Sequence, residues 1–199
     1  MKLHTEPTVL WIVGEPGLGK TTLVRRILGE ELTFNEKPKW SFGREGRVSA
    51  AGWYSGGTFD GADTVPYNAV NEALAYWTAE VLPKSPLTVL DGDRFSIEPA
   101  WRFFRDHEAK PRTATVLLAA PSEIGAARRA ARSTTVQNAT WVRGRVTKAR
   151  GFFERNPDAI ELDATRSPEE VFASLKAFLE TPPRAAPDPS EVGVLGMFE

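Results

Sequence analysis

One short segment of the sequence combines glycine, lysine and threonine at the spacing of a phosphate-binding loop. The pattern G-x-x-x-x-G-K-[ST] occurs once, from Gly14 to Thr21. Its glycines would let backbone N–H groups turn toward a polyphosphate, while Lys20 reaches the outer phosphates and the Thr21 hydroxyl ligates Mg²⁺. The segment therefore predicts a nucleoside triphosphate site with these loop contacts: Gly14, Pro16, Gly17, Gly19, Lys20, Thr21 and Thr22.

A second polar segment, Asp91-Gly92-Asp93-Arg94, directly follows an apolar run. Open α/β sheets bind ligands at the carboxyl ends of their strands, so we expect this turn beside the phosphate loop. Asp91 is the first candidate for a metal carboxylate or a general base, and Asp93 is the second. Arg94 would neutralise charge on a transferred group. The alternative is a polar turn, because Asp and Gly are common turn formers.

Positive charge is concentrated in the 30 residues 124–153, which carry a charge of +7 and contain no acid. Arg128 and Arg132 are four residues apart and share a helix face, and Arg145 follows on a second predicted helix. Such a segment could close over a bound triphosphate and bring these three arginines to its phosphates. The alternative is a solvated basic face.

The whole chain, by contrast, is nearly neutral. It has 199 residues, 25 Lys and Arg against 26 Asp and Glu, and a formal charge of -1. This balance excludes a uniformly basic nucleic-acid binder. With no cysteine and two histidines, the sequence predicts no disulfide, thiol nucleophile or zinc site, so any metal is expected to be a hard ion held by oxygen ligands.

Apolar runs separated by helical periodicities predict the elements that position these residues. Runs at 8–13, 87–90, 113–119 and 159–162 are typical of strands buried in a parallel sheet, with helices over 66–82, 99–110 and 167–179. The segment 34–57 adds a further strand or hairpin. This alternation predicts an α/β fold: a three-layer, doubly wound, mainly parallel five-stranded sheet.

In order along the chain, these motifs resemble the adenylate and thymidylate kinase group of phosphate-loop (P-loop) kinases. The resemblance spans residues 8–179 and rests on the phosphate loop, Asp91-Gly92 with Arg94, the R-x-x-x-R of Arg128 and Arg132, and D-A-T-R-S-P-E-E-V from Asp163 to Val171. It implies ATP and Mg²⁺ as cofactors, a helical lid, and Arg166 at the nucleotide. The chain lacks the proline of the group's D-G-x-P-R turn and a monophosphate-binding signature, so the acceptor stays open.

Two further strings are similar to those of small bacteriophage kinases that phosphorylate 5-hydroxymethyluracil in DNA. They are G-G-T-F-D-G-A-D-T at 56–64 and Q-N-A-T-W-V-R-G-R-V-T-K at 137–148. The resemblance implies that bases extruded from DNA stack on aromatic side chains and that polar side chains hold the acceptor or the DNA backbone. The implied residues are Trp53, Tyr54, Phe59, Asp60, Asp63, Gln137, Trp141, Arg143 and Lys148. The alternative is that the aromatic residues pack in the core or lid.

The preferred interpretation is an ATP- and Mg²⁺-dependent kinase whose acceptor is 5-hydroxymethyluracil in phage DNA. A nucleoside monophosphate kinase acting on free nucleotides and a non-catalytic, nucleic-acid-associated ATP-binding module are the alternatives. We expect a P-loop kinase domain over 1–180, with a lid inserted at about 124–153, and a proline-rich tail over 181–199. The chain shows no apolar run of membrane-spanning length and no signal peptide, so we expect it in the cytoplasm, that of the host if a phage encodes it.

Overall fold

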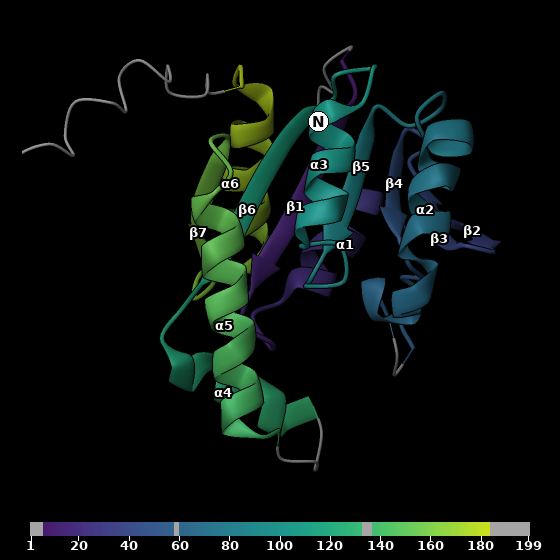
Figure 1. Cartoon of the computed structure of the whole chain (residues 1–199). Coiled ribbons are helices and arrows are strands. Elements are labelled where there is room, and N and C mark those ends of the chain that lie inside the picture. Colours follow the sequence, from purple (N-terminus) through teal and green to yellow (C-terminus); the bar gives the residue numbers. More distant parts are fainter. Residues whose placement is uncertain (1–5, 58–59, 133–136, 184–199) are drawn as a thin grey trace, which may run out of the picture.

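Seven strands form one sheet in the order β2-β3-β4-β5-β1-β6-β7 (Figure 1). The computed structural model describes residues 6–57, 60–132 and 137–183. Five neighbouring strands, β4, β5, β1, β6 and β7, pair in parallel, whereas β2 and β3 are antiparallel additions at one edge. The strands are β1 (Thr8–Gly14), β2 (Thr33–Glu36), β3 (Lys39–Gly43), β4 (Val48–Ala51), β5 (Leu87–Asp91), β6 (Arg112–Ala119) and β7 (Ala159–Asp163).

The central strand β1 explains the three-layer arrangement. Every residue of T-V-L-W-I-V-G is buried, as expected for a strand covered on both faces. Because successive side chains point to opposite faces, Leu10 and Ile12 belong to one hydrophobic cluster, and Trp11 belongs to the other. One strand thus contributes to two separate cores.

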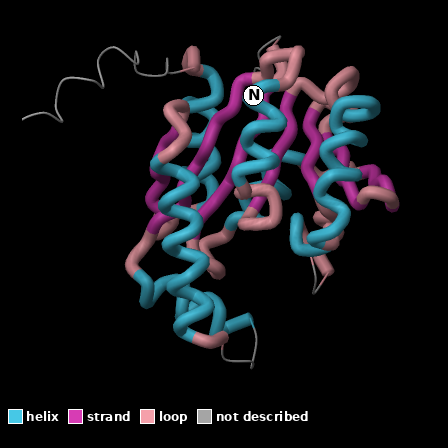
Figure 2. Tube along the Cα trace, in the orientation of Figure 1, coloured by secondary structure: helices cyan, strands magenta, loops and turns pink. Residues whose placement is uncertain are grey.

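Helices cover both faces of the sheet (Figure 2). The cluster that contains Leu10 also contains residues of α1 and α6, and the cluster that contains Trp11 contains residues of α2, α3 and α5. The helices are α1 (Lys20–Leu28), α2 (Val70–Tyr76), α3 (Glu98–Asp106), α4 (Ser122–Arg132), α5 (Ala139–Glu154) and α6 (Pro168–Glu180), with 3₁₀ turns at Ala62–Thr64 and Tyr67–Ala69 and a π-helical turn at Trp77–Val81.

The helix α4 and the first half of α5 project beyond the carboxyl edge of the sheet (Figure 1). Side chains at the start of α5 are largely exposed, whereas Ala149 and Phe152 near its end are buried against the sheet. The segment 124–153, apart from residues 133–136, which lie outside the described ones, therefore includes a projecting helical pair next to the phosphate loop.

The structure corrects two details of the predicted fold. The sheet has seven strands rather than five, because residues 33–43 form a hairpin that pairs antiparallel with β4. The helix predicted over 66–82 is divided into 3₁₀, α and π segments. Its π-helical part contains buried Trp77, whose indole N–H donates to Thr88 Oγ1 at 2.9 Å, so a tertiary contact accompanies the change in helix type.

The predicted tail lies mostly outside the described residues, which end at 183. In the described part of the chain, every helix is too short or too polar to cross a membrane.

Candidate active site

The phosphate loop connects β1 to α1 at the carboxyl edge of the sheet. Gly14 has φ 143°, and a Cβ there would lie 2.5 Å from the carbonyl oxygen of Leu118, so only glycine fits. The Lys20 ammonium donates to the carbonyls of Gly14 and Glu15 at 2.9 and 3.0 Å. Burial lowers the pKa of Lys20, and the nearby charges of Asp91 and Asp63 oppose that shift. The loop thus holds a desolvated cation where a polyphosphate would bind.

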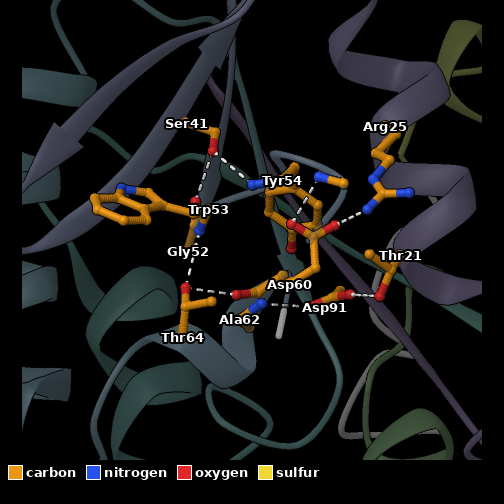
Figure 3. A network of polar contacts seen from close by, with 12 residues as sticks. Thr21, Arg25, Ser41, Gly52, Trp53, Tyr54, Asp60, Ala62, Thr64 and Asp91 are labelled. Atoms are coloured by element: carbon orange, nitrogen blue, oxygen red, sulfur yellow. Dashed lines mark hydrogen bonds and ion pairs between the residues drawn. The ribbon is translucent and has the colours of Figure 1, made fainter. Parts of the chain in front are cut away.

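Asp91 ends β5, the strand next to β1, and its carboxylate is buried beside the loop (Figure 3). Thr21 Oγ1 donates to Asp91 Oδ2 at 3.2 Å, and the Ala62 N–H donates to Oδ1 at 3.0 Å. Burial raises the pKa of Asp91, although the Ala62 hydrogen bond and the Lys20 charge pull it down. A cation bound at this carboxylate would offset the cost of burying its charge.

The paired hydroxyl and carboxylate of Thr21 and Asp91 suit Mg²⁺. This ion commonly takes one or two protein oxygen ligands and completes its octahedron with water and phosphate oxygens. Among the described residues, no cluster of three or more His, Asp or Glu side chains could form an all-protein metal cage. The site therefore fits an ion that arrives with a nucleotide.

The loop 52–64, of which the structure describes residues 52–57 and 60–64, approaches this pair at Gly61. Gly61 has φ 79°, and a Cβ there would lie 3.3 Å from Asp91 Oδ2 and 3.4 Å from Thr21 Oγ1. The Gly61 N–H donates to the Trp53 carbonyl at 2.5 Å, and the Thr64 hydroxyl donates to the Gly61 carbonyl at 2.8 Å. No pattern in the sequence marks Gly61, because its close approach to the Asp91 carboxylate depends on how the loop folds.

Two cavities flank the phosphate loop, and Gly17 lines both. The first, which we call the arginine cavity, encloses about 430 Å³ between the loop, α1, α4 and the start of α6. Its charged lining residues are all cations: Arg26, Arg128, Arg132 and Arg166. Three of the predicted phosphate-side arginines therefore meet in one cavity.

The second, which we call the aspartate cavity, encloses about 200 Å³ on the other side of the loop. It lies between the loop, the turn after β5, the loop 52–64 and the start of α5. Its charged lining residues are four carboxylates and two cations: Asp60, Asp63, Asp91, Asp93, Lys20 and Arg145. The predicted residues Gln137 and Trp141 also line it, as do Gly14, Pro16 and Gly17 of the phosphate loop.

Solved structures with a similar fold include two proteins described as kinases. A gluconokinase from Sinorhizobium meliloti 1021 matches 88% of this chain and 93% of its own at 14% identity, with a TM-score of 0.51. A sugar kinase from Janibacter sp. HTCC2649 matches 87% of this chain and 95% of its own at 15% identity, with a TM-score of 0.52. The chain has the fold of P-loop kinases. No protein-family model and no curated protein sequence gives a significant match.

Within this kinase fold, Asp93 is held by cations of α5. It forms an ion pair with Arg145, and its carbonyl accepts a hydrogen bond from Lys148 Nζ at 2.9 Å. The Lys148 Nζ also lies 3.6 Å from the Asp93 carboxylate. The predicted lid is thereby linked directly to the acidic turn after β5.

Arg94 connects the same turn to the loop 52–64 and the residues after it. Its guanidinium lies 3.6 Å from the Asp63 carboxylate and 3.6 Å from the centroid of the Tyr67 ring. Only 11% of the Arg94 side chain is exposed, so it is set among these partners. Tyr67 begins the 3₁₀ turn Tyr67–Ala69 and falls within the predicted helix 66–82, but nothing in the sequence indicated that its ring would stay exposed beside Arg94.

Several predicted acceptor residues lie elsewhere. Trp53 donates its indole N–H to the Asn35 carbonyl at 2.8 Å, and its ring lies against Phe34. Tyr54 is buried, and burial together with the charge of Asp91 raises its pKa well above the ordinary value. Neither ring is among the described residues that line the aspartate cavity. Tyr54 is too buried to stack on a base, whereas the half-buried Trp53 stays a prediction.

Three other predicted residues have distinct positions. Asp60 lines the aspartate cavity, but its carboxylate forms an ion pair with Arg25 of α1 and accepts a hydrogen bond from the Gly56 N–H, so it anchors the loop. Arg143 is exposed and donates to Thr140 Oγ1 at 3.3 Å. Phe59 lies outside the described residues.

The phosphate loop and α4 are joined by a contact that the sequence did not predict. Arg129 donates to the Glu15 carboxylate at 2.6 Å and to the Pro16 carbonyl at 2.5 Å. The Glu15 side chain is 9% exposed, and Arg129 supplies the opposite charge beside it. Glu15 occupies a variable position of the loop pattern, and its spacing from Arg129 gives no sequence signal.

Proposed function

We propose that the protein is an ATP- and Mg²⁺-dependent kinase that transfers the γ-phosphoryl group of ATP to an alcohol. The P-loop kinase fold, the desolvated Lys20 and the Thr21–Asp91 pair support the donor half of this proposal. In the arginine cavity, Arg128, Arg132 and Arg166 would neutralise the triphosphate.

The charge of the aspartate cavity is the observation that carries the proposal for the acceptor. Four carboxylates face two cations in its lining. A phosphate acceptor would bring about two further negative charges against these carboxylates. A neutral hydroxyl brings none, and it can donate a hydrogen bond to a carboxylate. This arrangement favours an alcohol over the phosphate that a nucleoside monophosphate kinase would accept.

As the preferred acceptor we propose a hydroxymethylated pyrimidine, 5-hydroxymethyluracil, carried in DNA. The two strings that resemble phage DNA kinases are more than 70 residues apart in the sequence. Both contribute to the lining of the aspartate cavity, Asp60 and Asp63 from one and Gln137, Trp141 and Arg145 from the other. Their meeting at the acceptor side of the phosphate loop supports a shared role in acceptor binding.

The reaction would be an in-line displacement at the γ-phosphorus. The acceptor oxygen forms a bond to this phosphorus, the bond to the β,γ-bridging oxygen breaks, and ADP leaves with its electron pair. Asp93 would orient the hydroxyl and receive its proton, while Lys20 and Arg145 stabilise charge on the transferred group. Thr21 and Asp91 would hold Mg²⁺, which supplies charge neutralisation at the β- and γ-phosphates when bound.

A panel of acceptors with γ-labelled ATP tests the proposal. We expect label in single-stranded DNA that contains 5-hydroxymethyluracil, and none in the same oligonucleotide with thymine, which lacks the hydroxyl. The Lys20→Ala variant should lose transfer by about a thousandfold or more, because it removes a charge that acts in the transition state.

Other results would select an alternative. Preferential labelling of free dTMP would favour a nucleoside monophosphate kinase. Nucleotide binding without transfer to any acceptor would favour a non-catalytic module.

A further inference from the structure

Two large aromatic side chains beside the aspartate cavity are exposed to solvent. Tyr67, which follows the loop 52–64, is 61% exposed, and Trp141, on the first turn of α5, is 43% exposed. Trp141 lines the cavity. Since aromatic side chains of this size are mostly buried in folded proteins, two exposed rings at one site indicate a surface that contacts a ligand.

A cation lies over the face of each ring. The Arg94 guanidinium is 3.6 Å from the Tyr67 ring centroid, and that of Arg145 is 4.9 Å from the Trp141 ring centroid. Arg145 also hydrogen-bonds to Tyr67 and thereby lowers the pKa of that phenol. Arg145 therefore contacts both aromatic side chains, and the four residues form a continuous strip from the loop after residue 64 to α5.

Positive charge is crowded along this strip. Lys148 lies next to Arg145, and burial together with the charges of Arg145 and Arg94 lowers the pKa of Lys148. The carboxylates of Asp93 and Asp63 offset only part of this charge, because they face three cations. Lys148 is not among the described residues that line the aspartate cavity, so a strand phosphate bound at Lys148 would relieve this repulsion without entering that cavity.

We propose that Tyr67, Arg94, Trp141, Arg145 and Lys148 form a binding strip for single-stranded nucleic acid, in which nucleobases stack on the two rings, Arg145 and Lys148 contact the intervening phosphates, and the nearly buried Arg94 holds Tyr67 in place. This inference rests on the proposed function and extends it from the target base to its neighbours in the strand. Stacking on aromatic side chains tolerates any base, because every base has a π-face. The strip thus holds the strand, and the aspartate cavity receives the target hydroxyl.

Fluorescence anisotropy of a labelled single-stranded oligonucleotide of about 15 nucleotides tests the strip without turnover. Tyr67→Ala and Trp141→Ala should each weaken binding roughly ten- to a hundredfold, whereas Tyr67→Phe should retain most of the affinity because the ring remains. Phe34→Ala is the matched control: Phe34 is 45% exposed and packs against Trp53 on the β2–β3 hairpin, away from the cavity lining. Circular dichroism would verify that each variant folds.

Kinetics with the hydroxymethylated oligonucleotide distinguish failure of the strip from failure of the proposed function. Support requires a raised KM for the oligonucleotide in both Ala variants and an unchanged KM for ATP. Wild-type protein that phosphorylates the oligonucleotide, with unchanged Kd and KM in both variants, would overturn the strip alone.

Two further outcomes are equally decisive. Strip-dependent binding without transfer to any acceptor would overturn the kinase and support the strip. If dTMP displaces the oligonucleotide at the same concentration as an unlabelled strand of equal length, the strip binds single nucleotides, and the inference of strand binding is wrong.

Discussion

The arginine cavity and the aspartate cavity share the phosphate loop but differ in charge. Among the residues that the structure describes, four arginines and no acids line the first, whereas four aspartates and two cations line the second. Under the proposed function, the first cavity suits a polyphosphate, and the second suits a neutral hydroxyl with a metal ion. The difference in charge between the two sides of the loop is therefore what the proposal of a phosphate-donor side and an alcohol-acceptor side depends on.

The largest expected effect comes from removing a carboxylate charge from the aspartate cavity. Asp91→Asn should lower kcat by about a thousandfold, since its carboxylate is the one bonded to Thr21. Asp93→Asn should lower kcat roughly ten- to a hundredfold, because Asp93 is proposed to orient the hydroxyl and not to hold the metal. Steady-state kinetics of both variants test this order, and a larger loss in Asp93→Asn would exchange the two roles.

The Asp91→Asn variant should also change the thermal stability of the protein, and the pKa of Asp91 gives the sign of that change. Because burial raises the pKa of Asp91, the folded state holds its proton more tightly than the unfolded state. The stability that this group contributes is full below its unfolded pKa and is lost as pH rises through its folded pKa. Asp91→Asn should therefore raise the Tm of the ligand-free protein at neutral pH more than at acidic pH, as thermal scans would show.

Arginine variants of the two cavities should have intermediate effects, and they should differ in whether the KM for ATP or the KM for the acceptor rises. Arg128→Ala and Arg132→Ala should each raise the KM for ATP about tenfold with little change in the KM for the acceptor. Arg145→Ala should raise the KM for the acceptor with little change in the KM for ATP, and it should also lower kcat. Arg102→Ala is the control, because Arg102 pairs with Glu98 on the surface of α3. A rise in the acceptor KM alone for Arg128→Ala would contradict the assignment of the arginine cavity to the donor.

The smallest effect is expected at the contact between Glu15 and Arg129. Arg129→Ala should lower the free energy of unfolding by about 1–3 kcal/mol, because it leaves the carboxylate of Glu15 nearly buried without its partner. The double variant Glu15→Gln with Arg129→Ala should recover part of this loss. Arg150→Ala breaks a half-exposed pair with Glu161 and should change stability by less than about 0.5 kcal/mol. Equal losses in Arg129→Ala and Arg150→Ala would show that the contact does not support the loop.

The phosphate loop and the acidic turn could be predicted because local sequence specifies them. Gly14 and Lys20 lie at fixed spacing, and Asp91 directly follows an apolar strand, so the alternation of strands and helices brings both to one edge of the sheet. The sequence did not predict that the segment 33–43 forms two additional strands, β2 and β3. Edge strands that are mostly exposed, as β2 is, lack the continuous apolar run that marked β1 and β5.

Residue types alone did not predict which aromatic side chains near the aspartate cavity are exposed. Aromatic residues near G-G-T-F-D-G suggested base stacking, but the folded loop turns Trp53 onto the hairpin and buries Tyr54, while Tyr67 stays exposed over Arg94. Which ring faces solvent depends on the path of residues 52–67. That path depends on contacts such as the Gly61 approach to Asp91, which joins residues far apart in the sequence.

The sequence alone determined the phosphate loop, the alternation of buried strands and helices and the concentration of positive charge in 124–153, because each follows from residue spacing or composition. Only the tertiary structure decided how that charge is divided. It brings Arg128 and Arg132 to the arginine cavity, Arg129 to Glu15, and Arg145 to Asp93. The physical reason is that side chains a few residues apart point in different directions from two projecting helices, so their partners are set by the packing of those helices against the loop.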